Sequence, residues 1–174
     1  MGLDINLYQF KKKQVEAILK LACLADPARM SDQVNIRAEA RKLGLPETIV
    51  TEPGFGGKRI SFPSAKHPEW LVGEWHSFGN VRAILRNFFG KDLYFLFPEA
   101  KGIYGLFRPD WLEAKNRLME ILQELNEISP STWQEVYPYA TRDNAVKKLE
   151  VMIETLDFVL NSGNPREFLL YWSN

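Results

Sequence analysis

The strict alternation of apolar and polar side chains near the start of the chain constrains the fold most. Leu3, Ile5 and Leu7 alternate with Asp4 and more polar neighbours over residues 3–10. This two-residue period is typical of a half-buried β-strand. The alternation is the cleanest in the chain, so we predict that residues 3–10 belong to the main sheet.

Amphipathic helical patterns account for much of the remaining sequence. We predict helices at 11–26, 31–44, 80–89, 110–127 and 141–160, from apolar residues spaced three and four apart. Short apolar segments at 58–62, 71–75, 93–97, 102–107 and 168–172 are candidates for strands, and 133–139 is interpreted as an aromatic linker. Strands and helices do not alternate regularly, which favours an α+β fold. We expect a small, mainly antiparallel sheet that includes the N-terminal strand and is packed by about five amphipathic helices.

The length predicts a single domain over residues 1–174, because a domain typically has about 150 residues. Residues 45–69 are rich in proline and glycine, so this segment is predicted to be a loop or an insertion. Within it, Lys58 and Arg59 follow a run of glycines. The run lacks the spacing of a phosphate-binding loop. A surface loop or hairpin is one interpretation, and contact of these two cations with an anion is the other.

Charge and cysteine content exclude several classes of function. The 22 basic and 22 acidic residues cancel, which argues against nucleic-acid binding and against a polybasic membrane anchor. The spacing of Ala40, Gly44 and Val50 resembles a helix-turn-helix core, but Pro53 would truncate its second helix. One cysteine and two histidines leave little for a disulfide framework or a metal centre. Without a leader pattern or an apolar run of ~18 residues, we expect a cytoplasmic protein with no cofactor and no metal.

His76 is the first candidate functional residue. It follows Trp75, and Glu74 two residues earlier lies on the same face if this segment is a strand. A carboxylate beside an imidazole can orient it as a general base. The alternative is that Glu74 and His76 lie on an exposed polar face and have no catalytic role.

Arginines interleaved with aromatic residues form the second candidate. Arg82 and Arg86 are four residues apart and share one face of the predicted helix 80–89. Together with His76 they are predicted to form a cationic patch able to clasp phosphate or carboxylate groups, with Trp75 and Tyr94 as stacking walls. The alternative is a solvated helix face paired to nearby glutamates.

The opening Met-Gly-Leu-Asp and the alternating residues 1–8 resemble a group of small phage and prophage proteins. The resemblance extends over roughly 70–174, with Glu74-Trp75-His76 leading into a helix, two long closing helices and an aromatic tail at 171–173. Members usually carry Arg-Lys after the tryptophan, where this chain has His76 and Ser77. The resemblance implies an accessory protein in phage–host conflict and implies no particular reaction.

Three functions follow from these observations. The first is a non-catalytic binding protein, of the counter-defence or immunity type, that captures an anionic small molecule or a protein partner. The alternative is a phosphoester-acting hydrolase or transferase with His76 as general base and Glu74 as its orienting group. The third is a structural or interaction subunit, which would expose an apolar patch. A homo-oligomer is compatible with each.

Overall fold

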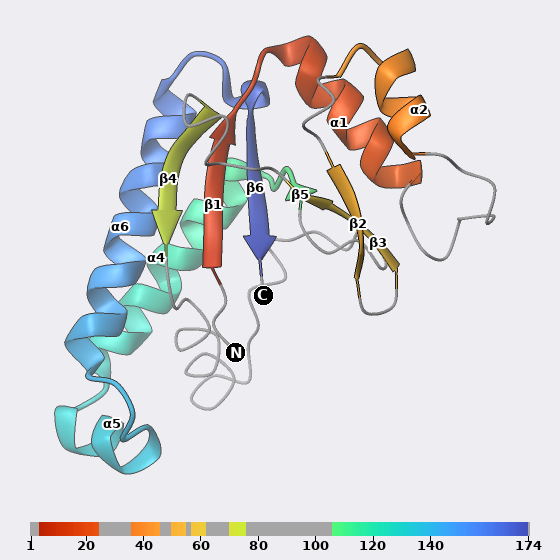
Figure 1. Ribbon diagram of the computed structural model, residues 1–174. Helices are drawn as coiled ribbons and strands as arrows, with labels where there is room; N and C mark the ends of the chain where they lie inside the picture. Colours follow the sequence, from red (N-terminus) through yellow and green to blue (C-terminus); the bar gives the residue numbers. More distant parts are fainter. Residues whose placement is uncertain are drawn as a thin grey trace.

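The computed structural model describes residues 4–24, 36–45, 50–54, 57–61, 70–75 and 106–173. Four described strands form an antiparallel sheet in the order β4 (Leu71–Trp75), β1 (Asp4–Gln9), β6 (Phe168–Ser173) and β5 (Leu106–Phe107). The helices are α1 (Lys12–Leu24), α2 (Ile36–Lys42), α4 (Trp111–Glu127), α5 (Pro130–Val136) and α6 (Arg142–Asn161). The predicted α+β class is confirmed, with the N-terminal strand inside the sheet (Figure 1).

Strand β1 is buried on both faces, whereas the alternation predicted burial on one. Ile5 and Leu7 pack with α4 and α6 in one core cluster. Tyr8 and Phe10 pack in a second cluster with residues of α1 and α2. The polar-looking face of β1 is therefore covered as well, and Asn6 is only 7% exposed. The sequence pattern placed Tyr8 on the polar face, but its aromatic ring supplies apolar area that packs in the second cluster.

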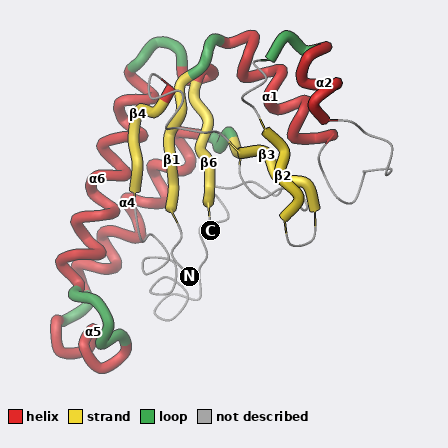
Figure 2. The backbone as a smooth tube through the Cα atoms, in the orientation of Figure 1, coloured by secondary structure: helices red, strands yellow, loops and turns green. Residues whose placement is uncertain are grey.

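Helices α4 and α6 form one layer against the sheet (Figure 2). Each begins at a side-chain cap: Asp110 accepts a hydrogen bond from the backbone N–H of Glu113, and Thr141 accepts one from that of Asn144. Both predicted helices at 110–127 and 141–160 are confirmed within a residue or two. The Lys115 ammonium, on α4, forms an ion pair with Asp157 on α6.

The predicted aromatic linker at 133–139 is wrong in its first half, which belongs to α5. Ser129 caps this helix and Pro130 occupies its first position, where proline is well tolerated. Trp133 is buried, and its indole N–H donates to the carbonyl of Ala140 at 2.6 Å. The short helix therefore closes over the end of the α4–α6 core.

The segment at 45–69 holds two strands where one was expected. Strands β2 (Val50–Gly54) and β3 (Gly57–Ser61) pair antiparallel in a separate two-stranded sheet. Val50 begins a strand, so it cannot lie in the second helix of a helix-turn-helix. Pro53 is tolerated because a two-stranded sheet leaves each strand an unpaired edge.

Several predicted elements lie outside the described residues. These are the helix at 80–89, the segment at 93–97, and parts of the segments at 31–44 and 102–107. None of the described helices combines the length and apolar composition needed to cross a bilayer.

Candidate ligand pocket

The structure describes four of the eight candidate residues predicted from sequence. Lys58 and Arg59 lie on β3, opposite Pro53 and Glu52, and Glu74 and Trp75 lie on β4. Glu74 is exposed and sits opposite Asn6 of β1. His76, Arg82, Arg86 and Tyr94 lie outside the described residues, so their convergence stays a prediction.

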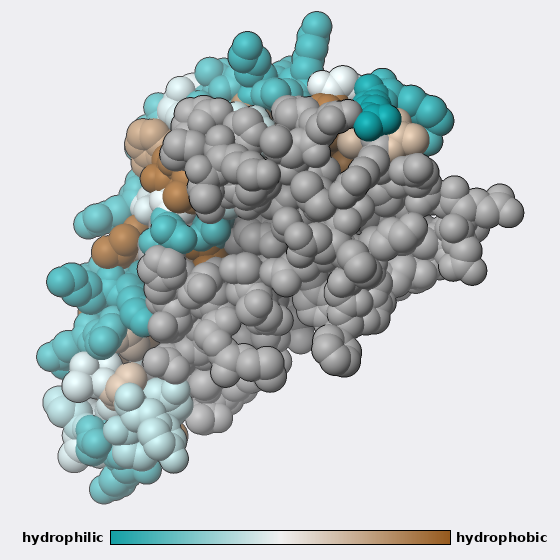
Figure 3. All heavy atoms as spheres, in the orientation of Figure 1, coloured by the Kyte–Doolittle hydropathy of each residue, from teal (hydrophilic) through white to brown (hydrophobic). Residues whose placement is uncertain are grey.

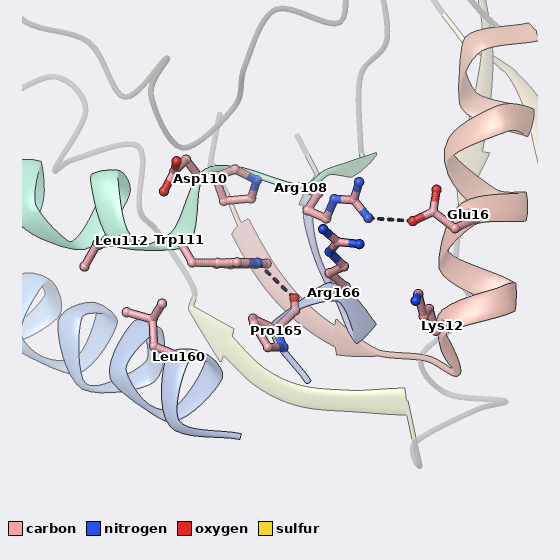
Figure 4. A pocket seen from close by; sticks show the side chains of 10 residues that line it. Lys12, Glu16, Arg108, Asp110, Trp111, Leu112, Leu160, Pro165 and Arg166 are labelled. Carbon is pink, nitrogen blue, oxygen red and sulfur yellow. Dashed lines mark hydrogen bonds and ion pairs between the residues drawn. The ribbon is translucent and has the colours of Figure 1, made fainter. Parts of the chain in front are cut away.

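A different cluster of cations lines a surface pocket at one end of the main sheet. The pocket has a volume of ≈ 630 Å³ and lies between the start of α1, the start of α4, the end of α6 and the 3-10 helix η3 (Pro165–Glu167). Its lining comprises Lys12, Glu16, Arg108, Pro109, Asp110, Trp111, Leu112, Leu160, Pro165 and Arg166. Figure 4 shows these side chains grouped around the Trp111 indole.

The strand register explains why cations distant in sequence meet here. Gln9, near the end of β1, pairs with Phe168 at the start of β6, so Lys12 and Arg166 emerge at the same end of the sheet. Phe107 of β5 pairs with Leu170 of β6, which brings Arg108 to that end too. The backbone N–H of Phe10 donates to the carbonyl of Glu167 at 2.8 Å and extends the pairing beyond the strands.

Two further contacts fix the walls of the pocket. The indole N–H of Trp111 donates to the carbonyl of Pro165 at 3.0 Å and ties the start of α4 to η3. The Arg108 Nη1 donates to the Glu16 Oε1 at 2.8 Å and ties the β5–α4 connection to α1. Trp111 is only 6% exposed, so its ring is a fixed element of the wall.

The charges in the pocket leave a net excess of one positive charge, because three cations face two carboxylates. The carboxylate of Asp110 is engaged as the cap of α4. That of Glu16 is surrounded by cations: the hydrogen bond from Arg108 lowers its pKa most, burial opposes this by a lesser amount, and the charges of Arg108, Arg166 and Lys12 each lower the pKa further. Glu16 therefore acts as an internal counter-ion.

The opposite part of the pocket holds most of its apolar side chains, together with the Asp110 carboxylate that caps α4 (Figure 4). Leu112 and Leu160 lie on one side of the Trp111–Pro165 contact in Figure 4, and the Arg108, Arg166 and Glu16 side chains lie on the other. Leu112 is 57% exposed although it is a large apolar residue at the start of a helix. The pocket thus has a charged end and an apolar end.

Sequence reasoning did not select the cations of this pocket. Arg108 stands directly before the Pro-Asp signal that starts α4, and Lys12 was assigned only to the opening of a helix. Nothing local to residues 12, 108 and 166 indicates that they meet. The signal lies in the pairing of β1, β5 and β6, which single-residue patterns do not reveal.

Within the described ranges, no group of three or more His, Cys, Asp or Glu side chains is arranged to hold a metal ion. Where Figure 3 colours described residues, the surface is largely hydrophilic, with hydrophobic areas separated by polar ones along the helical flank.

The chain matches no protein-family model, and comparison with curated proteins and with solved structures gave no match. The resemblance to phage and prophage proteins accordingly stays a prediction.

Proposed function

We propose that this protein is a non-catalytic binding protein that captures the anionic group of a small ligand in the pocket between α1, α4 and η3. The observation that carries the proposal is the meeting of Lys12, Arg108 and Arg166, from three separate elements, around one carboxylate. Guanidinium groups present planar forks of N–H donors that suit phosphate and carboxylate oxygens.

The charges of the pocket favour binding over proton-transfer chemistry. An arginine side chain stays protonated in proteins and cannot serve as a general base. The lowered pKa of Glu16 makes its carboxylate a weak base near neutral pH, whereas a general base works best with a pKa near the working pH. The pocket is thus suited to hold an anion without transforming it. A phage-accessory protein of the counter-defence type would have use for such capture.

The experiment is a titration of the ¹⁵N-labelled protein with inorganic phosphate, followed through the tryptophan indole N–H signals. We expect the Trp111 signal to shift, because this indole lines the pocket. The Trp133 signal should stay in place, because its indole is bonded to Ala140 under α5. Arg108→Ala should weaken phosphate binding about tenfold, the equivalent of ~1.4 kcal/mol, which is close to the value of one charge-assisted hydrogen bond.

Arg117→Ala is the matched control. Arg117 also pairs with a glutamate, Glu113, at 2.6 Å, but lies outside the pocket lining. The control should bind phosphate as the wild type does. A Trp111 signal that phosphate leaves unmoved, or equal affinity of the two arginine variants, would overturn the proposal.

A further inference from the structure

We infer that the ligand is an amphipathic organic anion, with an oxyanion head and an apolar body directly attached to it. This inference rests on the proposed function and names the class of molecule that the same pocket takes. The charged end accounts for the head. The apolar end needs a separate explanation, because an inorganic anion has no apolar surface to place against it.

Three apolar side chains form the apolar end. Trp111 is held in place by its bond to Pro165, so its ring forms a rigid wall at no further entropic cost. Leu112 extends from the same turn of α4, and Leu160 comes from the last turn of α6. All three line the pocket that Arg108 and Arg166 line, so one small molecule can contact both ends (Figure 4).

The exposure of Leu112 supports this reading. More than half of this side chain faces solvent, although it borders a pocket with buried apolar groups. A ligand body placed against it would remove that apolar area from water, which stabilises the complex by about 25 cal/mol per Å². The guanidinium groups of Arg108 and Arg166 lie at the other end of the pocket. The favourable orientation therefore places the head of the ligand at these two arginines and its body at Leu112.

The test compares inorganic phosphate, phenyl phosphate, benzoate and phenol as probes in the same indole titration. We expect phenyl phosphate to bind at least about fivefold more tightly than inorganic phosphate, as burial of ~40 Å² of apolar surface would give. Phenol should bind more weakly than phenyl phosphate. Benzoate carries a carboxylate head in place of the phosphate. Whichever of benzoate and phenyl phosphate binds more tightly identifies the preferred head, and either result supports the inference.

Leu112→Asn and Met119→Asn form the variant pair. Met119 is 49% exposed on the same helix and lies outside the pocket lining. Leu112→Asn should remove the preference for phenyl phosphate over inorganic phosphate, whereas Met119→Asn should preserve it. Equal affinities of phenyl phosphate and inorganic phosphate would overturn the inference and leave the proposed function intact. Binding of neither phosphate would overturn the proposed function itself.

Discussion

Glu16 limits access to Arg108, so its removal should strengthen anion binding. The incoming head must either displace the Glu16 carboxylate from Arg108 or share the guanidinium with it. Replacement of Glu16 by glutamine removes the negative charge and preserves the size of the side chain. We therefore expect the Glu16→Gln variant to bind inorganic phosphate more tightly than the wild type does.

The exposure of the pair sets the size of this effect. The Arg108 and Glu16 side chains are 30% and 49% exposed, so solvent screens their interaction. Such pairs contribute about 0.2–1 kcal/mol. At ~1.4 kcal/mol per tenfold change in affinity, this range predicts phosphate binding about 1.4- to 5-fold tighter.

The assay is the indole titration at fixed pH and low salt, with Glu113→Gln as the control. Glu113 forms a pair of similar length with Arg117 on the exposed surface of α4, and its side chain is about as exposed as that of Glu16. This control removes the same charge from the protein without altering the pocket lining, so it should leave the phosphate affinity unchanged. Equal or weaker binding by Glu16→Gln would refute the role of Glu16 as a competing counter-ion. An equal gain in both variants would trace the effect to net charge instead.

Three further predictions concern stability. Leu149→Ala should lower the free energy of unfolding by about 3 kcal/mol, and Tm by about 6–12 °C in calorimetry, because Leu149 is fully buried in the α4–α6 core; the exposed Val151→Ala on the same helix should change Tm little. Asn6→Val should raise the urea midpoint, because the buried Asn6 Oδ1 has no hydrogen-bond partner among the described residues and the substitution removes only the long bond, 3.3 Å, from Asn6 Nδ2 to the Tyr8 hydroxyl; a lower midpoint would contradict this reasoning. Because Arg108 lowers the pKa of Glu16, the stabilisation from their pair is complete above the unfolded pKa and is lost as pH falls through the folded value; urea unfolding should therefore separate wild type from Glu16→Gln at neutral pH, and the separation should shrink as pH falls below the ordinary pKa of a glutamate.

The sequence predicted those elements whose signals are local. The alternation at 3–10 identifies β1, and the Pro-Asp pair at 109–110 identifies the start of α4, because caps and periodicity act over a few residues. The aromatic residues at 133–139 suggested a linker, whereas Ser129 and Pro130 carry the cap signal that begins α5. Strand β2 was not predicted, because Pro53 and Gly54 are untypical of strands; pairing with β3 stabilises it.

The candidate pocket could not be predicted, for a different reason. Its cations come from positions 12, 108 and 166, and they meet only because β1, β5 and β6 pair in one register. The residues selected from sequence, by contrast, were neighbours along the chain. A segment rich in arginine and aromatic side chains shows only which residue types are close in sequence. The position of a binding site depends on which strand ends the fold brings together.

The pairing of β1 with β6 also affects how the chain can be synthesised and folded. Asp4 pairs with Ser173, so the two central strands come from opposite ends of the described chain. On the ribosome, the face of β1 that packs on α4 and α6 stays uncovered, and the edge that pairs with β6 stays unpaired, until residues 111–173 have been translated. A high contact order of this kind slows folding and exposes intermediates to aggregation. Production of this protein should accordingly be sensitive to chaperone supply and to growth temperature.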